Sequence, residues 1–513
     1  MNIYQSIEEL QKEALALIQN KSLTYEQQTF GLAKLAENVL SYPEGADEEL
    51  MELAQEGIVC DLHEGHAPYA PRYVLPDYDL LFRKGSPFLR LDPPKTLTDA
   101  IHTLLIFYHH VPSITRFPVY IGRIDQLLNP FIEDEAQARE QIKWFLIQLD
   151  RTIDDSFCHG NIGPQETLAG NIILDLLKDL QNVTPNLTLL YNPKITSNSF
   201  AQKCVSTSMA CANPAFANDQ MFRQEFQGDY GIASCYNGLP IGGGAFTLSR
   251  LRLNKIALKS QSLEDFMTNQ LPTAIHAMTR FMESKIRFLV EETTFFTESF
   301  LVKEGFISLD RFVGLFGLVG MHECVNALMK LENKAVTYGK DQEANELGVA
   351  IMDLIQKEVD TFESKYSDFW NHRYMLHAQV GADQDQGTSA GVRIAIGQEL
   401  PIYEHLRQAG MFHKYFPSGI GDHFPFDHTV LNNPQAVLDI FEGGFASGMR
   451  YISCYAEDGD LIRVTGYLIK KSDLEAYNQG KQVSYDTVQY AQEAINTYGV
   501  LNRKVRGESD ARR

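Results

Sequence analysis

Ile462-Arg463-Val464-Thr465-Gly466-Tyr467-Leu468 lies close to the C-terminus of this 513-residue chain and is its most informative stretch. By itself it predicts a strand that ends in a turn at Gly466, followed by further apolar residues. The glycine also permits a chemical interpretation. Because glycine has no Cβ, its backbone tolerates geometries that other residues avoid, including the flattened one in which a Cα radical conjugates with both adjacent amides. A structural turn and a radical site are both open at this point.

A second informative stretch lies near the middle of the chain. Ser234-Cys235-Tyr236-Asn237-Gly238 leads through Leu239-Pro240-Ile241 and three glycines into the apolar Ala245-Phe246-Thr247-Leu248. This order favours a cysteine at the tip of a tight loop, with backbone packed closely around it. A buried structural cysteine beside a turn is the commoner alternative. A phosphate-binding loop is disfavoured, because no Lys-Ser/Thr pair follows the glycines at the required spacing.

A third stretch, Gly122-Arg123-Ile124-Asp125-Gln126-Leu127-Leu128-Asn129-Pro130-Phe131, precedes both of the others. Its local interpretation is a turn into a short helix that Pro130 ends. Two weaker stretches are residues 320–328, which include Glu323, and residues 448–453. The three main stretches are therefore spread along most of the chain, and only the fold can bring them together.

In this order the stretches resemble motifs of the glycyl radical enzymes. Arg463-Val464-x-Gly466-Tyr467 resembles the radical-bearing loop of that superfamily. The Cys235 stretch resembles the thiyl-cysteine region of anaerobic (class III) ribonucleotide reductases, and the Gly122–Phe131 stretch resembles the pyruvate formate-lyase-like branch. The resemblance covers most of residues 100–500 and is closest to the YjjI family of glycine radical enzymes.

The resemblance implies an α/β fold: a ten-stranded α/β barrel of two half-barrels that encloses a Cys loop and a Gly loop and is surrounded by helices. Helical patterns alternate with short apolar runs, such as residues 186–191 and 241–248, which independently indicates α/β architecture. We expect an N-terminal helical and loop region over residues 1–95 and a catalytic barrel over 96–455, with the Cys loop near residue 235. The glycyl radical loop and a helical tail should occupy 456–513.

The resemblance also implies roles for individual residues. Gly466 would store the radical and Cys235 would form the transient thiyl. A radical S-adenosylmethionine activating enzyme would generate the radical in trans, since no C-x-x-x-C-x-x-C cluster motif occurs in the chain. For Asn237 the favoured alternative to substrate binding is a hydrogen bond within its own turn. The candidates for substrate binding are Tyr236, Asn237, Glu323, Arg123 and Asp125. A homodimer is a further expectation of the family.

Departures from known subfamilies narrow the reaction. Cys235 is followed by Tyr236 rather than by a second cysteine, which argues against acetyl transfer. Asn237 stands where the dehydratases carry a glutamate base, which disfavours simple elimination. We expect anaerobic, oxygen-sensitive radical chemistry of a lyase or oxidoreductase type on a small polar organic substrate. One alternative is a ribonucleotide-reductase-like reduction of a nucleotide or deoxysugar. Another is a non-catalytic barrel that binds a ligand.

Composition limits the partners. A formal net charge of −21 argues against nucleic acid or an anionic membrane as the main partner. The N-terminus predicts an amphipathic helix rather than a signal peptide, and we expect a cytoplasmic protein. No bound metal is expected, because the seven cysteines are widely spaced. Unspecific acid–base candidates are His109-His110, His322-Glu323, Asp422-His423 and Asp427-His428.

Overall fold

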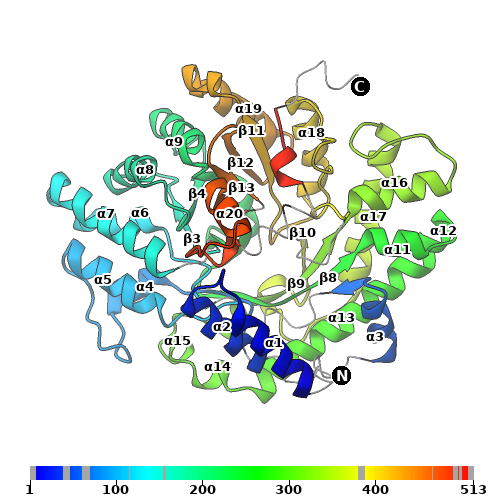
Figure 1. Ribbon diagram of the computed structural model, residues 1–513, viewed down its shortest axis with the longest axis horizontal. Coiled ribbons are helices and arrows are strands. Elements are labelled where there is room, and N and C mark those ends of the chain that lie inside the picture. Colours follow the sequence, from blue (N-terminus) through cyan, green and yellow to red (C-terminus); the bar gives the residue numbers. More distant parts are fainter. Residues whose placement is uncertain are drawn as a thin grey trace.

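The computed structural model describes residues 7–37, 47–60, 70–114, 116–153, 157–378, 387–464, 466–488, 495 and 499–505. Helices make up much of this part of the chain and lie on the outside of the molecule (Figure 1). The longer ones are α1 (Ile7–Gln19), α2 (Tyr25–Glu37), α3 (Glu48–Gln55), α4 (Tyr78–Lys84), α5 (Leu97–Tyr108), α7 (Glu135–Thr152), α8 (Leu168–Leu180), α9 (Asn198–Cys211), α10 (Asp219–Glu225), α11 (Leu253–Lys259), α13 (Leu271–Arg287), α16 (Met321–Leu331), α17 (Gln342–Thr361), α18 (Ile402–His413), α19 (Pro434–Ala446) and α20 (Lys471–Asn478).

Within the described residues, the strands inside these helices form two five-stranded sheets. In the first, β8 pairs in parallel with β9 and antiparallel with β1 and β2, and β10 pairs in parallel with β9. In the second, the order is β11-β12-β5-β4-β3, and the β12–β5 pair is antiparallel. The bounds are β1 (Val59–Cys60), β2 (Tyr73–Leu75), β3 (His159–Ile162), β4 (Asn186–Tyr191), β5 (Ala215–Asn218), β8 (Gly243–Arg252), β9 (Phe312–Val319), β10 (Met375–Ala378), β11 (Asp422–Phe426) and β12 (Tyr451–Ala456).

Two further strand pairs stand apart from these sheets. They are the hairpin of β6 (Tyr230–Ala233) with β7 (Asn237–Pro240), and that of β13 (Leu461–Arg463) with β14 (Leu468–Lys470). In Figure 1 β13 and α20 are drawn over the middle of the view, and β13 lies against β12. The prediction of an α/β barrel in two halves that encloses two loops is confirmed.

Burial explains why the strands can be read from the sequence. All residues of β4, β8 and β9 are buried, as in parallel strands that helices cover on both faces. The apolar run 186–191 is β4, as predicted. The run 241–248 is shifted, since β8 begins at Gly243 and continues to Arg252. The predicted helical tail begins with α20, which ends at Asn478, and part of the remainder lies outside the described residues.

Two of the three glycines after the cysteine loop pack against other backbone. Gly244 has a φ of +152°, and a Cβ there would collide with the carbonyl oxygen of Tyr73 on β2. A Cβ on Gly243 would collide in the same way with the carbonyl oxygen of Arg311. The glycines thus let neighbouring segments approach closely at the start of β8. No helix in the described ranges combines the length and apolarity that crossing a bilayer would require.

Candidate active site

Cys235 lies at the tip of the β6–β7 hairpin, which we call the cysteine hairpin. Ala233 pairs with Asn237, so Ser234, Cys235 and Tyr236 form the turn. Ser234 adopts a φ of +56°, a left-handed conformation that is uncommon for a residue with a side chain. Cys235 is 7% exposed. The tight turn therefore presents the thiol from a buried position.

Several elements hold this hairpin. The Ser234 amide donates to the Val119 carbonyl at 2.8 Å. The carbonyl of Ser234 is paired with Nδ1 of His159, and Nε2 of that ring is 2.7 Å from Thr188 Oγ1. Burial lowers the pKa of His159 to about 3, so the ring is neutral at physiological pH. Asn161 bonds both backbone groups of Ile232 through its amide.

Gly466 lies at the tip of the β13–β14 hairpin, which we call the glycine hairpin. Its carbonyl oxygen accepts hydrogen bonds from Asn186 Nδ2 and, at 3.0 Å, from Arg463 Nη1. The same guanidinium donates through Nε to the Ala212 carbonyl at 2.9 Å. Arg503 in turn donates to the Arg463 carbonyl at 3.0 Å. Side chains from distant parts of the chain thus hold the hairpin in place.

The two hairpin tips meet. A Cβ built on Gly466 would lie 2.5 Å from Cα and 2.8 Å from the carbonyl carbon of Cys235, and closer still to its Cβ. Real Cβ atoms essentially never approach other atoms so closely, so any larger residue at position 466 would displace the cysteine backbone. The fold thus places the two predicted catalytic residues in contact although they are far apart in the sequence.

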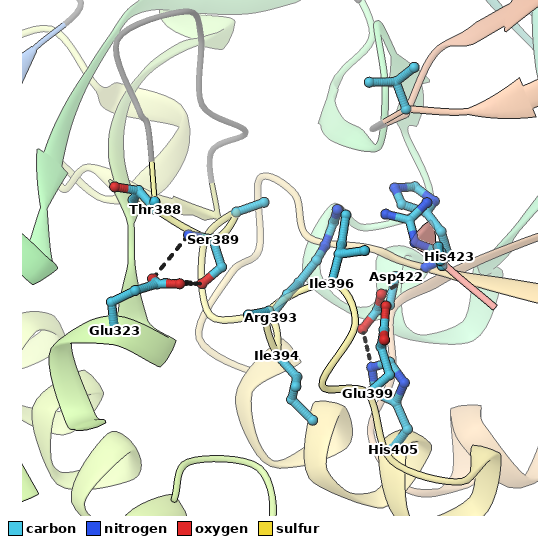
Figure 2. Close-up of a pocket in the computed structure, with 15 residues that line it drawn as sticks. Glu323, Thr388, Ser389, Arg393, Ile394, Ile396, Glu399, His405, Asp422 and His423 are labelled. Carbon is cyan, nitrogen blue, oxygen red and sulfur yellow. Dashed lines mark hydrogen bonds and ion pairs between the residues drawn. The ribbon is translucent and has the colours of Figure 1, made fainter. Parts of the chain in front are cut away.

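A cavity of about 170 Å³ lies beside the two hairpins, but neither Cys235 nor Gly466 is among the residues that line it. Val464 of the glycine hairpin lines it, as does Arg393, whose guanidinium carbon lies 5.3 Å from the centre of the Tyr236 ring. Figure 2 shows Arg393 between two polar groups, Glu323 with Ser389 on one side and Asp422 with His405 and His423 on the other. Ile394, Ile396, Glu399 and Arg503 also line the cavity.

Several buried ionisable groups line this cavity. His405 Nε2 lies 2.8 Å from Asp422 Oδ2. Burial raises the pKa of Asp422, but His405 and Arg393 outweigh it and hold that pKa well below its usual range. Burial lowers the pKa of His423 far below its usual value, and Arg393 adds to this effect. Burial also raises the pKa of Glu323. Asp422 therefore stays ionised and His423 stays neutral at physiological pH, and Glu323 is the group of the lining whose pKa moves toward that range.

The candidate substrate-binding residues fall into two groups. Glu323 lines the cavity and accepts bonds from the Ser389 amide and hydroxyl. Tyr236 lies beneath Arg393, and its hydroxyl donates to the Ala378 carbonyl at 3.0 Å. Asn237 bonds the Ala233 carbonyl across its own turn. Of the five candidates only Glu323 lines the cavity, and Tyr236, Asn237, Arg123 and Asp125 are not among its lining residues.

Arg123 and Asp125 support the structure around the cysteine hairpin. Arg123 donates to the Tyr230 carbonyl at the start of β6. Asp125 is fully buried and accepts bonds from the Gly163 amide and the Thr167 hydroxyl, both at 3.1 Å. Burial raises the pKa of Asp125 to about 6. Arg123 therefore fixes the start of the cysteine hairpin, and Asp125 fixes the loop that contains Gly163 and Thr167.

Sequence reasoning missed most of the groups around the two tips. Asn186, His159, Arg393, His405 and Arg503 carry no motif that marks them. A weak signal existed for Asp422 and His423, which form one of the predicted acid–base pairs. Of the other pairs, His428 is exposed and lies 2.8 Å from Asp458, at the surface.

A cysteine and a glycine that meet on two hairpins inside an α/β barrel define the class of glycyl radical enzymes. This chain belongs to the glycyl radical enzyme YjjI-like family, which matches residues 23–506. It is 43% identical to an uncharacterized protein of Haemophilus influenzae over 97% of this chain and 98% of that protein. It is 41% identical to the uncharacterized protein YjjI of Escherichia coli over 97% and 96% of the two chains.

Solved structures share the fold at low sequence identity. An anaerobic ribonucleotide reductase from Thermotoga maritima, in complex with dATP and CTP, has a TM-score of 0.65 at 14% identity and covers 92% of this chain and 89% of that one. A Roseburia inulinivorans structure, described for 1,2-propanediol dehydration, has a TM-score of 0.67 at 12% identity, with 97% and 89% coverage. The barrel is therefore common to proteins with different substrates.

Proposed function

We propose that this protein catalyses anaerobic radical chemistry in which Gly466 stores the unpaired electron and Cys235 carries it to the substrate. The contact between the two hairpin tips is the observation that supports the proposal. In the first step the Cys235 S–H bond breaks and a Gly466 Cα–H bond forms, which leaves a sulfur-centred radical. That thiyl then takes a hydrogen atom from a carbon of the substrate, and the thiol is restored.

The surroundings of the two residues suit this chemistry. Cys235 and Gly466 are both buried, which keeps solvent from the radical centres. The adjoining cavity supplies a place for a small polar organic molecule, and Glu323, whose pKa burial raises, provides for proton transfer. We infer that the reaction is of the lyase or oxidoreductase type.

A separate activating enzyme of the radical S-adenosylmethionine type would generate the radical. Since Gly466 is buried against Cys235, that enzyme can reach the glycine only when the glycine hairpin leaves the barrel. Release would break the bonds of Asn186 to the Gly466 carbonyl and of Arg463 to the Ala212 carbonyl, and would expose buried residues such as Leu468.

Electron paramagnetic resonance after anaerobic activation tests the proposal. A radical on Gly466 should give a doublet, split by the single remaining α-hydrogen, and Gly466→Ala should give none. Absence of the doublet in wild type, with an activating enzyme shown to be competent, would overturn the assignment of Gly466.

Deuterium exchange tests the cysteine. In D₂O the wild-type doublet should collapse to a single line, because the exchangeable thiol of Cys235 passes deuterium to the glycine. Cys235→Ser should keep both the radical and the doublet, since a hydroxyl O–H bond is too strong to be broken by the glycyl radical. A collapsed signal in that variant would remove Cys235 from the mechanism.

A further inference from the structure

Arg393 is the guanidinium of the cavity whose charge no described group neutralises directly. Its Nε donates to the Gly421 carbonyl at 2.6 Å, which orients the side chain. Among the described residues, no carboxylate forms an ion pair with it, and its Nη2 is buried without a hydrogen-bond partner. A buried guanidinium N–H without an acceptor is unfavourable, and a ligand oxygen would relieve it.

The neighbouring charged groups are already occupied. Asp422 is paired with His405, and both carboxylate oxygens of Glu323 accept hydrogen bonds from Ser389. The third carboxylate of the lining, Glu399, accepts the Gly397 amide and lies in the field of Arg503. Arg503 lines the same cavity, but it donates to the Arg463 carbonyl and to the Tyr455 hydroxyl at 3.4 Å. Among these groups, the charge of Arg393 is therefore the one left for a ligand.

His423 provides a second polar contact beside Arg393. The side chain is 2% exposed, its Nδ1 is paired with the Ser453 hydroxyl, and its Nε2 is buried with no partner in the described part of the chain. A neutral imidazole nitrogen can bond a hydroxyl group of a ligand. Arg393 and His423 both line the cavity, so one small molecule can contact both.

We propose that the substrate is a small hydroxylated anion, whose carboxylate or phosphate group binds Arg393 while a hydroxyl group contacts His423. This proposal rests on the proposed function, because it treats the cavity beside the two hairpins as the substrate site. A guanidinium suits planar, two-point recognition of such oxyanions. A cavity of about 170 Å³ holds a molecule of roughly six to ten non-hydrogen atoms.

Three probes that differ in the group at one end test the proposal. They are glycerol, glycerate and glycerol 3-phosphate, titrated calorimetrically into resting protein under argon. At least one anion should bind wild type about tenfold or more tightly than glycerol does. The anion that binds more tightly separates a carboxylate site from a phosphate site. Equal binding of all three, or binding of none, would overturn the proposal.

Variants of Arg393 test whether this residue causes the preference for an anion over glycerol. Arg393→Gln should abolish the preference for the anion, and Arg393→Lys should keep part of it, because lysine retains the charge but loses the planar fork. Arg139→Gln, a change on the exposed face of α7, is the matched control and should bind as wild type does. An undiminished preference in a folded Arg393→Gln protein would overturn the role of this residue.

The binding assay needs no radical, so it can fail independently of the proposed function. A normal glycyl doublet together with no anion preference would contradict the substrate class alone. A clear anion preference that Arg393→Gln removes, in a protein that never forms the doublet, would contradict radical catalysis alone.

Discussion

The two hairpins that meet in the barrel are held in different ways. The cysteine hairpin is joined to its surroundings by backbone as well as by side chains, since Ser234 bonds Val119 and Asn237 bridges to Gly419. The glycine hairpin is held at its tip through side chains, since Asn186 donates to the Gly466 carbonyl and the hairpin's own Arg463 donates to the Ala212 carbonyl. A fixed thiol and a removable glycine are what an enzyme needs if another protein must reach the glycine before each period of activity.

The largest effect should come from removing the side chain that holds the glycine hairpin. Arg463→Met loses the bonds to Gly466 and Ala212 and leaves a buried carbonyl unpaired. We expect a loss of about 2–4 kcal/mol in the free energy of unfolding, measured by urea denaturation. Arg139→Met on the surface should change stability by less than about 0.5 kcal/mol. Wild-type stability in Arg463→Met would show that the hairpin is held by packing alone.

Acid should weaken the anchoring of the cysteine hairpin, because its anchor His159 titrates, as do other buried histidines such as His377 and His413. The pKa of the buried His159 ring is lowered to about 3, so between pH 6.5 and pH 3 the unfolded state binds the proton and the folded state does not. Stability from His159 is present above pH 6.5 and is lost as the pH falls, by roughly 1.4 kcal/mol per pH unit.

The variant His159→Asn lacks this titration. It should be less stable than wild type at pH 7, and the difference should narrow as the pH falls from 6.5, as followed by urea unfolding at several pH values. His102→Asn, at an exposed position on α5, should show no such narrowing. A difference independent of pH would mean that His159 is accessible to protons in the folded protein.

Asn186→Ala should loosen the glycine hairpin by a smaller amount. It removes one of the two hydrogen bonds to the Gly466 carbonyl and leaves that of Arg463. We expect a loss of about 1–2 kcal/mol in stability and faster amide hydrogen exchange at residues 466–468, with exchange in the cysteine hairpin unchanged. Equally faster amide exchange in both hairpins would show that the two hairpins are not held independently.

The smallest effect should follow Tyr236→Phe. The hydroxyl donates to the Ala378 carbonyl, while the ring packs between Arg393 and Tyr451. Phenylalanine keeps the ring and loses one hydrogen bond, so we expect about 1 kcal/mol in denaturant unfolding. Radical yield should not change, because the backbone of the cysteine turn is fixed elsewhere. A large fall in yield would indicate that the hydroxyl contributes to the reaction.

Much of the barrel could be predicted because its central strands are buried on both faces and appear as apolar runs. The run 186–191 is such a strand. The two hairpin tips could be predicted because a cysteine turn and a glycine turn have short local signatures. What could not be predicted is the set of partners, since Asn186 and Arg503 reach the glycine hairpin only after the barrel has closed.

The candidate substrate residues show the same limit. Glu323 reached the cavity, whereas Arg123 and Asp125 lie in a recognisable motif whose contacts fix loops. A motif marks a segment that the fold requires, and does not say whether a side chain faces a ligand or the backbone. Arg393 has no motif, and its position depends on the Gly421 carbonyl and the Tyr236 ring.

Two residues that hold the glycine hairpin lie far before it in the sequence, so they are synthesised first. Asn186 precedes Gly466 by 280 residues, and Ala212 precedes Arg463 by 251. The ribosome thus releases the receiving site long before the hairpin that fills it, and N-terminal parts fold first during translation. All strands of the two sheets precede the hairpin in the sequence, so it can enter a barrel whose strands have already been made. Opening of the hairpin for activation would then be the reverse of the last step of folding. The same conformational change would serve both assembly and activation.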